Sequence, residues 1–325
     1  MTSRAVTVRA PAKINLELRV GAPRADGFHE LATVFQAISL ADDVTVRATG
    51  GSIDEPIQVT LDSDFAHLDG DPSAGDDGRT GAVPLDETNL VVRAVRLLAE
   101  RTGVGEGVAI HIRKRIPVAG GMAGGSADGA AALLAADQLW HSGSSRDQLR
   151  ALAAELGSDV PFPLLGGTAV GTGRGEQLTP ALCRGSYTWV IATSGRGLAT
   201  PSVFAETDRL RAGRVLPVPR VGPELMAALR SGNAVAVGAR LANDLQPAAC
   251  SLRPDLERTL EVGRESEALG GLVSGSGPTV AFLVRDAEHA LDVRAALEAA
   301  EVADQVITVT GPVHGARVIE EFARG

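Results

Sequence analysis

A glycine-rich run that precedes an alanine-rich stretch could form a phosphate-binding loop. Gly120, Gly121, Gly124 and Gly125 all stand before Ser126. Glycines at this density let the backbone take positive φ angles and approach a ligand closely, because no Cβ stands in the way. If a helix begins here, its unpaired N–H groups and the positive end of its dipole favour an anion. Ser126 could cap that helix or turn its hydroxyl toward a phosphate or toward Mg²⁺.

The run matches neither of two common nucleotide-binding signatures. The chain contains no Gly-x-x-x-x-Gly-Lys-[Ser/Thr] sequence. It also has no Gly-x-Gly-x-x-Gly after the preceding strand. Asp128 in the first turn suits the helix dipole, provided that its carboxylate points away from the ligand. The plain alternative is a tight turn before a buried helix, although such a turn seldom needs four glycines.

Two charged residues far apart in the chain are candidates for chemistry on an alcohol. Lys13 lies between the alternating runs 6–10 and 14–20, in the middle of a predicted strand ladder, and Asp159 follows a predicted helix that stops at Gly157. An alcohol is a weak nucleophile and needs an adjacent base, or a cation that favours its alkoxide. Each residue also has a plain structural reading, since Lys13 could form a structural ion pair and Asp159 could cap its own turn.

Lysine is scarce in this chain. Of 31 basic residues only Lys13 and Lys114 are lysines, and the rest are arginines. Lysine and arginine side chains differ in geometry, hydration and ease of pKa shift, so we ask what a lysine does at each of these two positions. Lys114 lies between two arginines just before the glycine run, which places it either near a nucleotide or on a solvated strand edge.

Periodicity indicates the elements that must position these residues. Alternating apolar residues predict strands, and a 3.6-residue spacing predicts helices. The predicted strands are 6–10, 14–20, 33–40, 43–47, 108–112, 188–193, 279–284 and 305–310, and the predicted helices are 89–101, 126–140, 146–156, 222–230, 233–241, 255–269 and 287–300. The closing strand–helix–strand pattern fits an α+β sandwich with helices on one face of an antiparallel sheet.

The length of 325 residues indicates roughly two domains, which we divide into residues 1–180 and 181–325. Hydrophobic residues at 44% and charged residues at 22% exclude wholesale disorder. An acidic, glycine-rich segment at 69–81 is expected to be a mobile surface loop.

Charge and cysteine content limit the partners. A net charge of −9 argues against nucleic acid, which requires a basic face, but permits a small anion held by backbone amides. The two cysteines match no metal or redox spacing, and the longest apolar stretch, 130–136, is too short for a bilayer. With no signal peptide visible at the start, we expect a cytoplasmic protein, monomeric or weakly dimeric, with no membrane partner.

Three motifs resemble those of the GHMP kinases (galactose, homoserine, mevalonate and phosphomevalonate kinases). Residues 117–128 are similar to the second family motif, 11–18 to the first and 271–278 to the third. The resemblance implies a mixed α/β N-terminal domain, a ferredoxin-like α+β C-terminal domain and an active site in the cleft between them. It implies ATP with Mg²⁺, with Ser126 a possible metal ligand and the nucleotide bound by Pro117, Val118, Ala119, Gly120, Gly121, Met122, Ala123, Gly124, Gly125, Ser126 and Ala127.

The match narrows within the family. One branch of the family phosphorylates a cytidine-diphosphate-linked branched tetraol at its 2-hydroxyl, on the non-mevalonate route to isoprenoid precursors. The segments of this chain that resemble that branch are Lys13-Ile-Asn15 and residues 24–30, 156–161, 88–98 and 200–204. That branch implies Lys13 and Asp159 as the catalytic pair. It implies that Phe28 and Phe204 sandwich the cytosine, that His29 reads its edge, and that Asn15 and Thr200 lie near the alcohol.

Each of these assignments has an alternative. Phe28 and Phe204 could be ordinary core residues, and His29 a surface turn residue. Homoserine or mevalonate could replace the cytidine compound as phosphate acceptor. A non-catalytic nucleotide-binding module would keep the glycine loops, but it would be free to lose Lys13 or Asp159, and both are present.

Overall fold

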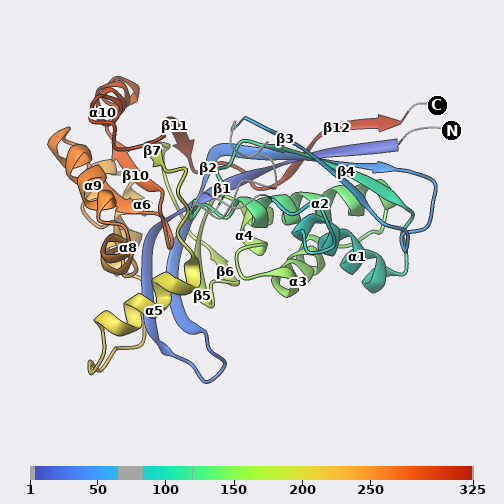
Figure 1. Ribbon diagram of the computed structural model, residues 1–325, viewed down its shortest axis with the longest axis horizontal. Coiled ribbons are helices and arrows are strands. Elements are labelled where there is room, and N and C mark those ends of the chain that lie inside the picture. Colours follow the sequence, from blue (N-terminus) through green and yellow to red (C-terminus); the bar gives the residue numbers. More distant parts are fainter. Residues whose placement is uncertain (1–3, 65–82, 119, 324–325) are drawn as a thin grey trace.

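The computed structural model describes residues 4–64, 83–118 and 120–323, which form two sheets covered by helices (Figure 1). The first sheet has the order β12-β1-β2-β4-β3, with β5 on β2, β6 on β5 and β8 on β1. Only the β3–β4 and β1–β8 pairs in it are parallel. Its strands are β1 (Arg4–Pro23), β2 (His29–Ala48), β3 (Gln58–Ser63), β4 (Val108–Lys114), β5 (Thr168–Gly173), β6 (Gln177–Pro180), β8 (Ala242–Asn243) and β12 (Arg317–Ala323).

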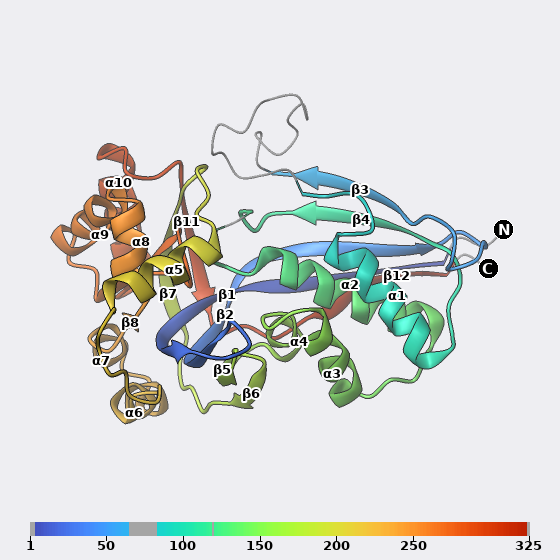
Figure 2. The same cartoon turned by 60° about the horizontal axis from the view of Figure 1, so that its bottom comes forward.

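Four helices gather on one face of the first sheet (Figure 2). They are α1 (Leu90–Thr102), α2 (Gly124–Trp140), α3 (Arg146–Leu156) and α4 (Pro161–Leu165). Their ends follow from local chemistry, since the Asn89 side chain caps α1 and Ser145 forms a capping box with Gln148 at α3. Gly103 ends α1 in the left-handed conformation that glycine adopts without strain.

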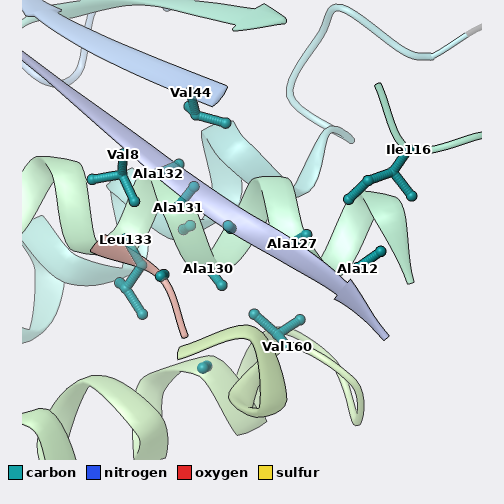
Figure 3. Close-up of a cluster of buried hydrophobic side chains, with 14 of the residues drawn as sticks. Val8, Ala12, Val44, Ile116, Ala127, Ala130, Ala131, Ala132, Leu133 and Val160 are labelled. Atoms are coloured by element: carbon teal, nitrogen blue, oxygen red, sulfur yellow. The ribbon is translucent and has the colours of Figure 1, made fainter. Parts of the chain in front are cut away.

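Small side chains on α2 allow this helix to pack closely against the sheet. Ala127, Ala130 and Ala131 are fully buried and lie beside Val8 and Ala12 of β1 (Figure 3). A helix buried on most sides carries no strong polar face, which explains the apolar run in the sequence. The position of α2 fixes the glycine run at its N-terminus relative to β1.

The second sheet has the order β11-β7-β10-β9 and is entirely antiparallel. Its strands are β7 (Tyr187–Thr193), β9 (Gly270–Val273), β10 (Val280–Val284) and β11 (Gln305–Gly311), and the helices of this half are α5 (Thr200–Leu210), α6 (Pro223–Ser231), α7 (Ala234–Gly238), α8 (Gln246–Leu252), α9 (Asp255–Glu265) and α10 (Ala287–Ala299). One face, with Val190 and Phe282, packs in a core shared with α8, α9 and α10, and the other, with Trp189 and Ile191, joins the core of the first sheet.

Strand β1 passes from one hydrophobic core to the other. Ile14 and Leu16 belong to the first core, whereas Leu18 and Val20 belong to the second. The pairing with β2 shifts register between Pro11 and Lys13 and again between Asn15 and Glu17. Such bulges bend a strand and redirect its side chains. The strands predicted at 6–10 and 14–20 form one strand, β1, with the polar residues Lys13 and Asn15 at its centre. The two bulges lie on either side of these residues.

Several expectations differ from the structure. The strands predicted at 33–40 and 43–47 form one strand, β2, because Asp42 at the predicted break is buried and accepts hydrogen bonds from Lys114, Arg115 and Ile116. The periodicity does not predict α4, α5, α8, β3, β5, β6, β8, β9 or β12. The acidic segment 69–81 lies outside the described residues.

The expected α+β fold, with a mixed α/β N-terminal part and an α+β sandwich in the C-terminal part, is confirmed. The division into residues 1–180 and 181–325 stays a prediction, since β8 and β12 come from the second part of the chain and pair in the first sheet. Among the described residues, no helix is long and apolar enough to cross a membrane.

Candidate active site

A cavity of about 820 Å³ is lined by residues from both halves of the chain. Most of the residues singled out from the sequence border it, namely Lys13, Asn15, Phe28, His29, Gly120, Gly121, Ala123, Gly124, Gly125, Ser126, Asp159, Thr200 and Phe204. Pro117, Val118, Met122 and Ala127 do not, and Ala119 lies outside the described residues. Residues separated by up to about two hundred positions therefore meet around one space.

Lys13 and Asp159 approach each other across this cavity. Nζ of Lys13 lies 3.8 Å from Oδ2 of Asp159, and the two side chains are 6% and 38% exposed. The ammonium also lies 5.3 Å from the centre of the Phe35 ring, which supplies a cation–π contact. A buried cation beside a more accessible carboxylate is suited to an alcohol that enters from the cavity, because the cation favours an alkoxide and the carboxylate accepts a proton.

A chain of hydrogen bonds fixes the orientation of the Lys13 side chain. Nζ of Lys13 donates to Oδ1 of Asn15 at 2.8 Å, and Nδ2 of Asn15 donates to the Thr33 hydroxyl at 2.8 Å. The Thr33 hydroxyl in turn donates to the Glu17 carbonyl oxygen at 2.7 Å. Both ends of the Asn15 amide are thus used within the protein, so that its flip state is defined by its partners.

The glycine run forms an open loop at the start of α2. Gly121 and Ala123 have φ angles of 73° and 59°, and α2 begins at Gly124. Among the described residues, none accepts a hydrogen bond from the backbone N–H groups of 120–126, and the N-cap has no side-chain cap. Free amides at the positive end of a helix bind anions such as phosphate. Ser126 in the first turn borders the cavity beside them.

In the motif at 271–278, residues 274–278 follow β9 and form a second loop that contacts the first directly. A Cβ on Gly121 would lie 2.2 Å from the Ser274 carbonyl oxygen, a distance that no real side chain tolerates. The Ser274 hydroxyl donates to the Gly121 carbonyl oxygen at 3.2 Å. Nδ2 of Asn243 holds the loop from beneath, donating to the carbonyl oxygens of Val273 and Gly275 at 2.7 Å each.

Helix α5 contributes one face to the far end of the cavity. Thr200, Phe204 and Asp208 are spaced by four residues and therefore lie on the same side of the helix. Oδ1 of Asp208 lies 2.9 Å from Nε2 of His29, and the His29 and Phe204 rings are 4.9 Å apart. Asp208 was missed in the sequence, although the four-residue spacing from Thr200 and Phe204 would have indicated it once a helix was assumed.

Phe28 occupies the tip of the β1–β2 hairpin and is 49% exposed. The guanidinium of Arg174, in the turn between β5 and β6, lies 4.9 Å from the centre of its ring. Phe204 packs on His29 rather than on Phe28, so the sandwich expected between the two phenylalanines stays a prediction. Nothing in the sequence pointed to Arg174.

Lys114 does not lie on a solvated strand edge, and its place near the nucleotide stays a prediction. Its side chain is 1% exposed, and Nζ donates to Asp42 at 2.5 Å and to Asp128 at 2.7 Å. Burial alone would lower the pKa of Lys114, but the two carboxylates outweigh it and raise that pKa above 10.5. The Asp128 carboxylate thus points away from the cavity, into the protein behind the glycine loop.

Burial also raises the pKa of Asp128 well above its usual 3.8, and the nearby Asp42 adds to this effect. Its Oδ1 is buried without a hydrogen-bond partner among the described residues. Two carboxylates share one ammonium here, and a Cβ on Gly124 would lie 3.1 Å from that Nζ. This cluster of Lys114, Asp42 and Asp128 connects the first turns of α2 to β2 and β4. It leaves no room for a residue larger than glycine at position 124.

The family comparisons match both halves of the chain. Residues 89–167 match the family described as GHMP kinases N terminal domain, and residues 225–303 match GHMP kinases C terminal. The first region contains the glycine loop and Asp159, and the second contains the loop at 271–278.

Curated relatives match over nearly the whole chain. A 4-diphosphocytidyl-2-C-methyl-D-erythritol kinase of Thermobifida fusca is 52% identical over 97% of this chain and 98% of its own, and one of Mycolicibacterium smegmatis is 50% identical over 98% and 94%. A crystal structure of 4-(cytidine 5'-diphospho)-2C-methyl-D-erythritol kinase superposes with a TM-score of 0.68 at 34% identity, covering 94% of this chain and 98% of that one. A homoserine kinase from Cytophaga hutchinsonii, at 21% identity and a TM-score of 0.70 over 97% of each chain, shares the fold.

Replacing Lys114 by methionine should destabilise the protein strongly. Lys114→Met keeps an unbranched side chain that is one atom shorter, but it leaves Asp42 and Asp128 without their shared cation, so the free energy of unfolding should fall by about 3–5 kcal/mol. Urea denaturation at pH 7 measures this value. A loss below about 1 kcal/mol would show that the two carboxylates do not depend on Lys114.

Asp128→Asn should leave the protein folded but change how its free energy of unfolding depends on pH. Since the pKa of Asp128 is raised in the folded state, the folded protein keeps a proton that the unfolded chain loses near pH 4. The wild type therefore loses stability relative to Asp128→Asn as pH rises above about 4, by up to about 1.4 kcal/mol per pH unit, until the folded pKa is passed. Urea denaturation of both proteins from pH 4 to 8 measures the difference, and a constant difference would contradict the shift.

Proposed function

The chain belongs to the GHMP kinase family, and we propose that it transfers the terminal phosphoryl group of ATP to the 2-hydroxyl of 4-diphosphocytidyl-2-C-methyl-D-erythritol. This reaction belongs to the non-mevalonate pathway of isoprenoid precursor biosynthesis. The relatives that share about half of their residues with this chain carry that name. The related structure at 34% identity carries the same activity in its name.

One observation supports the proposal above the others. The Lys13–Asp159 pair, with its 3.8 Å separation, borders the same cavity as the free amides of 120–126. A kinase needs an anion site for the phosphates and, within reach of it, a place where an alcohol can be activated. A nucleotide-binding module without catalysis would not need the second of these.

In the proposed mechanism, Asp159 accepts the proton that the hydroxyl loses as its oxygen bonds to the terminal phosphorus, and ADP leaves with the bridging oxygen. Lys13 lies beside the same oxygen and favours its developing negative charge. Phosphoryl transfer passes through a loose transition state, so that positioning and charge stabilisation carry most of the catalysis. The hydrogen bond from Lys13 to Asn15 supports this role, since it limits the motion of the ammonium.

The substrate-binding assignments remain part of the proposal. Phe28 and Phe204 supply aromatic surface for the cytosine, and His29 is held by Asp208 in an orientation suited to reading the base edge. Asn15 and Thr200 border the cavity where the polyol would lie. Stacking on aromatic rings accepts a pyrimidine readily, because every base has a π-face.

Mg²⁺ is proposed as the companion of ATP. The described residues contain no group of three or more His, Cys, Asp or Glu side chains that could hold a metal ion. Mg²⁺ that accompanies a nucleotide takes few protein ligands and uses phosphate oxygens and water for the rest. The Ser126 hydroxyl beside the free amides would be its protein ligand, and the bound ion would neutralise charge on the phosphates.

The remaining assignments concern the protein as a whole. We propose a cytoplasmic enzyme, monomeric or weakly dimeric, that binds no nucleic acid. The net charge of −9 supports the last point, because a polyanion would be repelled.

An acceptor assay tests the function directly. The protein should release ADP from ATP and Mg²⁺ when 4-diphosphocytidyl-2-C-methyl-D-erythritol is present, and not with homoserine or mevalonate. A coupled assay of ADP measures the rate with each alcohol. Turnover of homoserine without turnover of the cytidine compound would contradict the proposal and indicate a homoserine kinase. No turnover of any of the three alcohols would favour a nucleotide-binding module without catalysis.

Asp159→Asn and Lys13→Ala should each lower kcat by about 10²–10⁴-fold, because each removes a group that acts on the attacking oxygen. ATP affinity, measured by calorimetry, should stay within about threefold of the wild type. Asp147→Asn is the matched control, since Asp147 is 84% exposed and outside the cavity. Near-normal kcat in either variant would remove that residue from the mechanism.

A further inference from the structure

Among the described residues that line the cavity, the charged groups are paired, with one exception. Among the described lining residues the cations are Lys13 and Arg174, and the acids are Asp159 and Asp208. Lys13 faces Asp159, and Asp208 faces His29. Within the described part of the chain, no carboxylate lies within ion-pair distance of the Arg174 guanidinium. In a protein with a net charge of −9, this leaves an unpaired positive charge inside a cavity that must accept anions.

Arg174 is held in place by its turn and by Phe28. Glycines on both sides of it, Gly173 and Gly175, have φ angles of 72° and 104°, and its backbone N–H donates to Glu176 at 2.7 Å. The half-buried guanidinium lies 4.9 Å from the Phe28 ring centre. A stacked guanidinium is weakly hydrated and presents its N–H groups in a plane, which suits binding of phosphate oxygens.

The position of Arg174 along the cavity separates it from the reacting alcohol. Leu31 of β2 pairs with Gly173, whereas Phe35, four residues further, lies beside Lys13. Four residues of strand span roughly 13 Å. A small alcohol such as homoserine held at Lys13 could not extend that far, but a nucleoside diphosphate joined to the alcohol could.

We propose that the Arg174 guanidinium binds the diphosphate of the alcohol substrate while it holds the Phe28 ring against the pyrimidine, and thereby selects a nucleoside-diphosphate-linked alcohol over a small free one. This inference rests on the proposed function, because it assumes a substrate of that class in this cavity. Arg174 then binds substrate at a distance from the reacting atoms, which predicts an effect on substrate affinity and not on the phosphoryl transfer step.

Calorimetric titrations of the full chain with CDP and with cytidine separate the two parts of the proposal. Arg174→Ala should weaken CDP binding by about tenfold or more, because a charge-assisted contact is lost, and should change cytidine binding by less than about threefold. In the kinase assay, KM for the cytidine substrate should rise while kcat and KM for ATP stay near the wild type. Arg214→Ala, at an exposed arginine outside the cavity, removes the same charge and should change none of these values.

Each other outcome has a defined meaning. Equal CDP affinity in wild type and Arg174→Ala would overturn the inference and leave the proposed function intact. An equal loss for CDP and cytidine would mean that Arg174 acts only through Phe28, which contradicts the contact with the diphosphate. If the wild type binds neither ligand and phosphorylates a different alcohol, the proposed function itself fails.

Discussion

The arrangement of the site depends on how closely the two glycine loops approach each other. The backbone of Gly121 lies so near Ser274 that a Cβ would come within 2.2 Å of the carbonyl oxygen of that residue. Nζ of Lys13 would lie 3.3 Å from a Cβ on Gly275, and the Lys13 backbone N–H donates to the Met122 carbonyl oxygen at 3.2 Å. Strand β1, the loop before α2 and the loop after β9 thus meet with no spare volume, and a shift of one would move the others.

The two lysines of the chain occupy the places where a compact ammonium is required. Lys13 and Lys114 are 5% and 1% exposed, and each faces an aspartate. Nζ of Lys114 would lie only 3.1 Å from a Cβ built on Gly124, which leaves little space for the larger, planar guanidinium of an arginine. Behind the loop, Lys114 also neutralises buried carboxylates that would otherwise repel an anion bound at the amides in front. The presence of lysine rather than arginine at positions 13 and 114 therefore has a physical reason.

Much of the site could be predicted from local sequence, because its requirements are local. A glycine run before an apolar helix needs only backbone freedom and free amides, and both can be inferred from residue types. The sandwich expected for the C-terminal half followed from alternating and helical spacing. The α5 helix was missed because it buries only Val203 and Thr207 and so shows little apolar periodicity. Strands β3, β5 and β12 were missed because their partners β4, β2 and β1 are distant in the chain, and β6 is a four-residue strand that pairs with β5. Asp208 was missed together with α5, and Arg174 because Phe28, which it contacts, is distant in the chain.

The sequence by itself determined the residue types and the periodicity: glycines where a Cβ would clash, a strand with Lys13 at its centre, and an alanine-rich helix after the loop. Tertiary structure decided which side chains meet. The 3.8 Å approach of Lys13 and Asp159, the burial of Lys114 and the stacking of Arg174 on Phe28 join segments far apart in the chain. Bulges in β1 and the packing of two cores set these distances, and a local pattern carries no information about contacts between distant segments.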